Sequence, residues 1–236
     1  MKIKVIMSDK AMSRETMDAR EKMLKVALSS DAEVSVDCIK KGPDELDCNT
    51  DEAFAAAEMV KESIRAEKEG YDHFMLKEIH EQPKGIRNTI TRRMDEEGNI
   101  VLDGIRMTKE EIENFNKVYI VACGTAYHAG LIGKTVIEKL AGISVEVDVA
   151  SEFRYRDPFV DENTLFIAIS QSGETLDTLA ALREAKRKGA RILSVVNVVG
   201  SSVARESDDV FYTWAGPEIA VASTKAYTTQ LVCMYL

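Results

Sequence analysis

Cysteine and histidine are scarce in this chain, and neither is arranged for metal binding or disulfide formation. The 236 residues include four cysteines and three histidines. No two cysteines have the Cys-x-x-Cys spacing of a zinc site, and no histidine pattern accompanies them. The chain also lacks a Gly-x-Gly-x-x-Gly motif, the mark of a dinucleotide site. We therefore expect reduced thiols, no metal site and no bound cofactor.

Long hydrophobic runs and basic clusters are absent as well. No apolar run approaches the roughly 18 residues of a membrane span, and the start MKIKVIM lacks the apolar core and cleavage site of a signal peptide. The net charge is −9, and no run of Lys and Arg is interleaved with aromatic residues. These absences predict a cytoplasmic protein with neither a membrane nor a nucleic acid as its partner.

The most informative stretch covers residues 164–188. Residues 165–169 form an uninterrupted apolar run of strand length, which is typical of a strand covered on both faces in a parallel sheet. Apolar residues at helical spacing begin at Leu176, and a cationic turn followed by Gly189 is typical of a helix C-terminus. The turn SQSGET, residues 170–175, connects the predicted strand to the predicted helix.

Two interpretations of this turn remain open from its residues alone. Main-chain amides and the positive end of the helix dipole face such a turn, so an anion such as phosphate can bind there with help from the hydroxyl groups. Alternatively, Ser172 or Thr175 merely caps the helix, as Ser and Thr often do. Glu174 lies at the same helix N-terminus, where the dipole favours a negative charge without any catalytic role.

Segments of strand length recur at regular spacing in the second half of the chain. This rhythm predicts an α/β fold with a doubly wound five-stranded parallel sheet. Ligands in such sheets bind beyond the C-terminal ends of the strands, where Cys123-Gly124-Thr125, SQSGET and the segment 222–229 lie. The predicted strands cover residues 118–123, 144–149, 164–170, 191–198 and 209–214, and the clearest helices cover 126–140 and 175–188.

Two further helical features precede this sheet. Residues 71–94 predict a long helix interrupted near Pro83, because proline lacks an amide donor and restricts the residue before it. Thr108 and Glu111 have the spacing of a capping box, which predicts a short helix after residue 108. His80 lies in the first of these segments, and without an evident partner it is interpreted as exposed or packed and not as a base.

The motifs CGT (123–125), SQSGET (170–175) and VASTKAYTTQ (221–230) together resemble the sugar isomerase (SIS) domain of the glutamine:fructose-6-phosphate aminotransferase family, the glucosamine-6-phosphate synthases. The resemblance begins near Tyr71 and extends to the last residue. It implies an SIS-type αβα sandwich over residues 71–236, preceded by a small α/β fragment over residues 1–70. It also implies binding of a hexose phosphate, either fructose-6-phosphate or glucosamine-6-phosphate. The implied contacts are Thr125, Ser170, Gln171, Ser172, Thr175, Val221 and Ser223.

The same resemblance implies that catalysis is incomplete in this chain. Isomerising fructose-6-phosphate requires a base that moves a proton between C1 and C2. In the resembling family the base glutamate, the ring-opening histidine and the imine-forming lysine belong to a second isomerase subdomain and the C-terminal tail, and a glutaminase domain comes first. We therefore expect a domain truncated at its C-terminal end, with no catalytic residue of its own, that forms a homodimer. A non-catalytic sugar-phosphate-binding or regulatory module is the alternative.

Residues 1–70 resemble a different family, the aspartate/glutamate and hydantoin racemases, through MKIKVI, MDAREKML and EVSVDCIKKGP. Strands are expected over residues 2–7 and 33–39, and helices over 13–28 and 51–69. The two cysteine segments that carry racemase chemistry have no counterpart here. Cys38 and Cys48 are accordingly interpreted as ordinary thiols, and racemase-type isomerisation is the least favoured function.

Overall fold

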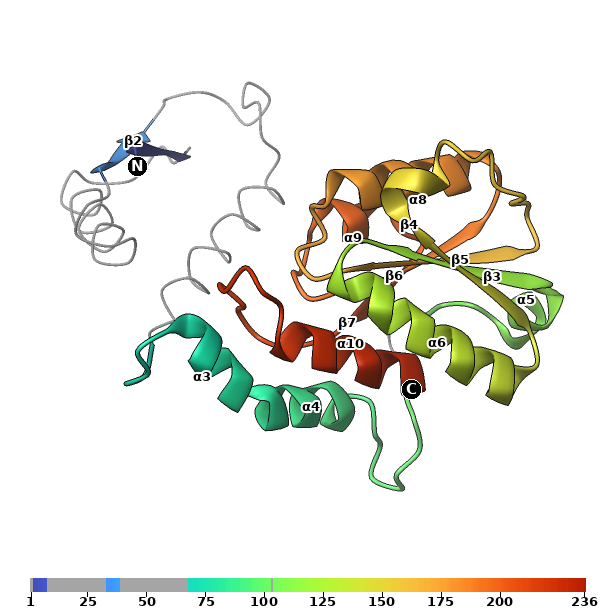
Figure 1. Cartoon of the computed structure of the whole chain (residues 1–236), viewed down its shortest axis with the longest axis horizontal. Helices are drawn as coiled ribbons and strands as arrows, with labels where there is room; N and C mark the ends of the chain where they lie inside the picture. The colour runs from blue at the N-terminus through green and yellow to red at the C-terminus, as the bar shows by residue number, and fades with distance from the viewer. Residues whose placement is uncertain (1, 8–32, 39–67, 103) are drawn as a thin grey trace. The chain divides into compact units, whose positions relative to one another are not determined.

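The computed structural model describes residues 2–7, 33–38, 68–102 and 104–236, and the chain divides into two compact units, Met1–Glu67 and Lys68–Leu236 (Figure 1). In the first unit β1 (Lys2–Met7) and β2 (Glu33–Cys38) pair in parallel, at the positions where strands were expected. The helices expected over residues 13–28 and 51–69 lie outside the described residues, except that Lys68 and Glu69 belong to a turn closed by the Tyr71 amide. Cys48 also lies outside the described residues.

A parallel sheet with the strand order β4-β3-β5-β6-β7 forms the centre of the second unit. This arrangement confirms the predicted five-stranded parallel sheet, and the central strands β3 and β5 are almost wholly buried, as their apolar runs predict. The last strand ends at Tyr212 and not at residue 214, because Trp214 adopts a φ of 54°, outside the β region. The strands are β3 (Lys117–Ala122), β4 (Ser144–Val149), β5 (Thr164–Ser170), β6 (Arg191–Val196) and β7 (Asp209–Tyr212).

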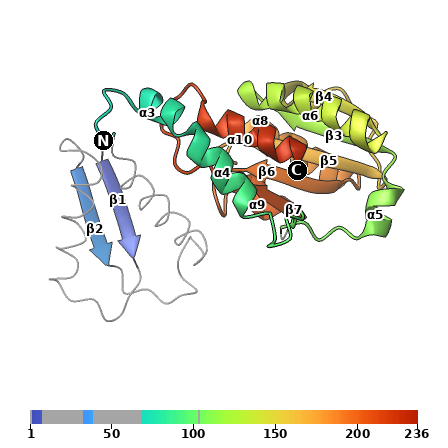
Figure 2. The same cartoon turned by 90° about the horizontal axis from the view of Figure 1, so that it is seen from below.

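Helices cover both faces of this sheet (Figures 1 and 2). Side chains of alternate strand residues point to opposite faces, so the sheet carries a separate hydrophobic core on each face. One core joins the sheet to α7 (Ala150–Phe153), α8 (Leu176–Arg187) and α9 (Ser202–Glu206). The other joins it to α6 (Thr125–Ala141) and α10 (Lys225–Tyr235). The result is the expected αβα sandwich.

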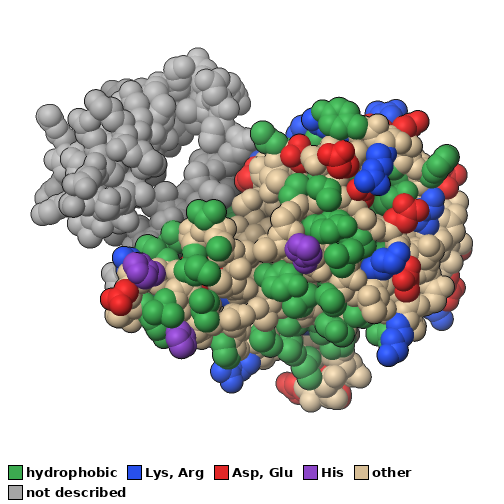
Figure 3. Space-filling model, viewed as in Figure 1, with side chains coloured by type: hydrophobic (Ala, Val, Ile, Leu, Met, Phe, Trp, Pro, Cys, Tyr) green, Lys and Arg blue, Asp and Glu red, His purple; other side chains and the backbone are tan. Residues whose placement is uncertain are grey.

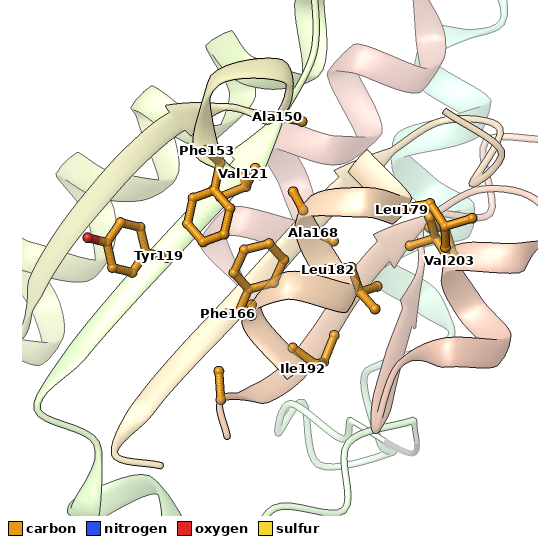
Figure 4. Packing of buried hydrophobic residues seen from close by; sticks show 14 of the residues in the cluster. Tyr119, Val121, Ala150, Phe153, Phe166, Ala168, Leu179, Leu182, Ile192 and Val203 are labelled. Atoms are coloured by element: carbon orange, nitrogen blue, oxygen red, sulfur yellow. The ribbon is translucent and has the colours of Figure 1, made fainter. Parts of the chain in front are cut away.

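The first core is centred on aromatic side chains (Figure 4). Phe166 on β5 and Phe153 on α7 are both fully buried, and their ring centroids lie 5.2 Å apart in an edge-to-face arrangement. Tyr119 on β3 meets the other side of Phe153 at 5.5 Å. Such pairs favour edge-to-face geometry because the positive edge of one ring faces the negative face of the next. This cluster holds the central strands against the α7–α8 layer.

Three shorter helices precede the sheet. Helix α3 (Phe74–His80) and helix α4 (Gln82–Thr91) are separate, with Pro83 in the first turn of α4, so the predicted interruption is confirmed. The predicted capping box is also confirmed, since Thr108 and Glu111 bond reciprocally at the start of α5 (Lys109–Asn114). His80 is exposed and stacks on Tyr71. Within the described residues, no helix combines the length and hydropathy needed to cross a membrane.

Helix α4 is joined to the rest of the unit through α10 and the end of β7. In Figure 2, α10 lies between α4 and α6, and it packs on both. The Thr89 hydroxyl, which is fully buried, lies within hydrogen-bond distance of the carbonyl oxygens of Gly85 and Thr213. Cys233 on α10 is a free thiol in this interface, and burial raises its pKa to about 12. The thiol is therefore protonated at neutral pH and acts as a small hydrophobic side chain.

Replacing Phe166 by alanine is expected to lower the free energy of unfolding by about 3–5 kcal/mol, because a fully buried ring is lost and a cavity remains. The matched control is Phe159→Ala. This phenylalanine is 85% exposed, so its replacement should lower the free energy of unfolding by well under 1 kcal/mol. Urea unfolding followed by circular dichroism would measure both. Similar losses for the two variants would contradict the assigned core.

Candidate functional site

The turn between β5 and α8 is organised by the hydroxyl group of Ser170. Ser170 is the last residue of β5 and is almost completely buried. Its Oγ accepts a hydrogen bond from the Gly173 amide at 3.0 Å and lies 3.2 Å from Oγ1 of Thr175. The Ser172 Oγ accepts from the Glu174 amide at 3.2 Å. These contacts bring Ser170, Ser172 and Thr175 together, as the sequence predicted for SQSGET.

Neither the Ser172 hydroxyl nor the Thr175 hydroxyl caps α8. Thr175 occupies the N-cap position, but its side chain makes no capping hydrogen bond, and Ser172 bonds to an amide before the helix. The capping alternative is therefore wrong. The amides of residues 175–178 have no hydrogen-bond acceptor among the described residues. A helix N-terminus that presents free amides and neutral hydroxyl donors is suited to an anion, because the dipole and the donors both favour negative charge.

The start of helix α9 is hydrogen-bonded to the turn between β5 and α8. The Val203 amide donates to the Gly173 carbonyl at 3.0 Å, and the Ser202 amide donates to Oε1 of Glu174 at 2.7 Å. Glu174 therefore caps α9, whereas its sequence position suggested only a favourable place beside the α8 dipole. This role joins elements far apart in sequence, and no local pattern could have revealed it.

Helix α9 is in turn bound to α8 by an ion pair. The Arg183 side chain donates from Nε and Nη2 to the two oxygens of the Glu206 carboxylate, at 2.7 and 2.5 Å. The hydrogen bonds from Arg183 hold the pKa of Glu206 below its ordinary value. The turn that follows β5 is thus hydrogen-bonded to α9, and α9 is in turn bonded to α8, the helix that follows this turn.

The turn after β3 lies beside the turn after β5, because the two strands are neighbours with Ala122 opposite Ile169. Thr125 is the first residue of α6 and is exposed. Cys123 is a half-buried free thiol, and the Thr178 hydroxyl lies 4.0 Å from its sulfur. The structure therefore brings Thr125 to the same edge of the sheet as the SQSGET turn. Ala126, beside it, is buried and offers no hydroxyl group.

The third predicted segment forms the loop before α10. Val221 is fully exposed, with a relative accessibility of 104%. Ser223 is half-buried and donates to Oε2 of Glu218 at 3.0 Å. Lys225 is 2% exposed, and its ammonium lies 2.5 Å from the Glu81 carboxylate.

Asn197, which sequence reasoning missed, connects the second turn to the third loop. The main-chain amide of Asn197 donates to the Gln171 carbonyl at 3.1 Å, and its side-chain nitrogen donates to the Gly216 carbonyl at 2.8 Å. Its side-chain oxygen accepts from the Ala215 amide at 2.8 Å. An asparagine just beyond β6 was the only available sign, and by itself it is common in turns. Within the described residues, no cluster of His, Cys, Asp or Glu is placed to hold a metal ion.

Fold and site together define an α/β domain with a hydroxyl-lined turn and an uncapped helix N-terminus at the carboxyl ends of its parallel strands. A family model described as the SIS domain matches residues 111–236, and the chain belongs to this family. Two relatives are named glutamine–fructose-6-phosphate aminotransferase [isomerizing]. The one from Clostridium tetani is 71% identical over 171 residues, and the one from Methanosarcina acetivorans is 54% identical over 172 residues.

A solved structure, the C-terminal domain of glucosamine-fructose-6-phosphate aminotransferase from Francisella tularensis, is 50% identical with a TM-score of 0.68. It covers 72% of this chain, and this chain covers 48% of that structure. Each of the two aminotransferases also matches 72% of this chain, which spans only 28% of their length. The resemblance of residues 1–70 to racemases finds no support in these comparisons.

Replacing Gly173 by alanine is expected to cost about 2–5 kcal/mol of unfolding free energy, because two penalties add. Its φ is +66°, and a Cβ would lie 2.0 Å from the buried Ser201 hydroxyl. Gly142→Ala is the matched control, since its φ is +68° but nothing lies within 4 Å of the added Cβ. In urea unfolding, Gly142→Ala should lose only the about 1–2 kcal/mol that a left-handed conformation costs a residue with a Cβ. Equal losses in the two variants would show that Ser201 does not pack against the turn.

Proposed function

We propose that residues 71–236 bind a hexose phosphate, with the phosphate at the N-terminus of α8. The observation that carries this proposal is the run of free amides at residues 175–178, which no side chain caps. Phosphate would accept from these amides and from hydroxyl groups lining the same edge of the sheet. The proposed phosphate contacts are Thr125, Ser170, Gln171, Ser172 and Thr175.

The sugar would extend toward the loop before α10, with Val221 and Ser223 as its contacts. Asn197 supports this orientation, because it holds the second turn to Ala215 and Gly216, which shortly precede this loop. Fructose-6-phosphate and glucosamine-6-phosphate are the proposed ligands, in keeping with the names of the aminotransferase relatives. The broader activity, glucosamine-6-phosphate synthesis within amino sugar biosynthesis, is proposed for the longer protein that such relatives represent.

Binding and orientation are the role that we propose for the site residues, and none of them is proposed as a catalytic base. Moving a proton between C1 and C2 of the sugar needs a group that exchanges protons near neutral pH. The proposed contacts are neutral donors and one valine. Glu174 and Glu218, which lie in the turn after β5 and in the loop before α10, already accept hydrogen bonds from main-chain amides. Because these carboxylates are already hydrogen-bonded, the second candidate function is a non-catalytic binding module. In that case the isolated chain would bind fructose-6-phosphate without converting it.

Two further expectations accompany the proposal, a cytoplasmic location and a homodimer. Apolar side chains gather over α3, α6 and α10 on the face seen in Figure 3, which supports self-association. On these helices, Met75 and Leu76 of α3 and Leu131 and Ile132 of α6 are each about 40% exposed. Light scattering behind a sizing column is expected to give twice the mass of one chain, and a monomeric peak at micromolar concentration would contradict the homodimer.

Calorimetric titration with fructose-6-phosphate and glucosamine-6-phosphate tests the binding proposal. Ser172→Ala and Thr175→Ala each remove a hydroxyl donor, so each should weaken binding by about tenfold or more, the worth of a hydrogen bond to a charged group. Thr135→Ala is the control, because this exposed hydroxyl on α6 bonds only to the Leu131 carbonyl. Unchanged affinity in all three variants would overturn the proposed phosphate site.

A further inference from the structure

The loop of residues 218–224, which carries Val221 and Ser223, is closed on itself by Glu218. Oε1 of Glu218 accepts from the Thr224 amide at 2.8 Å and from the Ala226 amide at 3.1 Å. Its Oε2 accepts from the Ser223 hydroxyl at 3.0 Å. Glu218 therefore caps α10 and gives the loop its internal shape. These contacts do not determine where the loop lies relative to the rest of the unit.

A second carboxylate, Glu78 on α3, contacts the loop from outside. Glu78 is 2% exposed, and its Oε1 accepts from the Ile219 amide at 2.6 Å. Both of its oxygens lie 3.3 Å from the Ala220 amide. Burying a carboxylate is costly unless hydrogen bonds compensate, and these compensating donors are the two amides that immediately precede Val221.

The next turn along the same side of α3 and α4 contacts the start of α10. Glu81 lies 2.5 Å from the buried Lys225 ammonium, and the side-chain Oε1 of Gln82 accepts from the Thr228 hydroxyl at 2.5 Å. Lys77 adds positive charge on this side, with ion pairs to Glu69 at 3.2 Å and Glu81 at 3.8 Å. Glu78, Glu81 and Gln82 follow helical spacing of three and four residues, so they face one neighbour together. The loop is thus held where it begins and where α10 begins.

We propose that Glu78 is a positioning residue for sugar recognition, setting the place of Val221 and Ser223 relative to the phosphate-binding turn. This inference rests on the proposed function. Val221 is fully exposed and has no packing of its own to fix it, so its position depends on the amides beside it. Glu78 has no contact with the phosphate-binding turn in the structure, and its effect is limited to the sugar.

Titration with two probes, fructose-6-phosphate and inorganic phosphate, separates this role from general stability. Glu78→Gln removes the charge that strengthens the amide bonds, so affinity for fructose-6-phosphate should fall by about tenfold. Affinity for inorganic phosphate should stay unchanged, because the turn after β5 is intact. Glu78→Asp retains the charge on a shorter side chain and should recover part of the lost affinity. Glu96→Gln makes the same chemical change on an exposed side chain and should alter neither affinity.

Amide hydrogen exchange of the wild-type chain tests the contact without a variant. Ile219 and Ala220 should be protected in the ligand-free protein, and Glu78→Gln should speed their exchange while leaving β5 protected. Fast exchange at both amides in the wild type would overturn the proposal even if Glu78→Gln did not fold. Fructose-6-phosphate binding that is equal in wild type and Glu78→Gln would overturn this inference alone. Absence of sugar-phosphate binding by the folded wild type would instead overturn the proposed function and this role with it.

Discussion

The unsatisfied main-chain amides at the first turn of α8 are the constraint on which the site depends. The first amides of a helix have no partner within the helix, and a side-chain cap commonly supplies one. Here Thr175 occupies the N-cap position without capping, and Ser170 and Ser172 bond to amides that precede the helix. The donors of residues 175–178 therefore stay available to a ligand. The surrounding elements keep this turn in shape in the absence of the anion.

Three carboxylates near the site, Glu174, Glu218 and Glu78, accept hydrogen bonds from main-chain amides. Glu174 bonds to the first amide of α9, Glu218 to the first amides of α10, and Glu78 to the loop that precedes α10. Each thereby stabilises a loop or turn that carries proposed ligand contacts. The site thus combines neutral donors with carboxylates, Glu174 and Glu218, that are already bonded to main-chain amides. Such an arrangement is suited to a phosphate held through dipoles and neutral donors, without a cationic side chain in the turn.

Strand and helix positions in the second unit could be predicted because their determinants are local. The apolar run before Ser170 and the alternation of apolar residues in β4 depend only on neighbouring residues and on burial. The early end of β7 could not be predicted, because the left-handed conformation of Trp214 depends on its tertiary surroundings. Asn197 and Glu174 escaped prediction for the same reason, since their partners at Gly216 and Ser202 are distant along the chain or belong to another element.

The sequence alone determined the fold class, the order of the elements and the three turns that carry the proposed ligand contacts, because parallel strands end at one edge of a sheet. Its motifs also indicated the SIS family. Tertiary structure decided what the polar side chains do there. It excluded the capping role of Ser172 and Thr175, buried Lys225 against Glu81, and placed Glu78 beneath the loop that bears Val221. Hydrogen bonds between distant segments require specific distances and directions, and these arise only when the packed elements bring the two groups together.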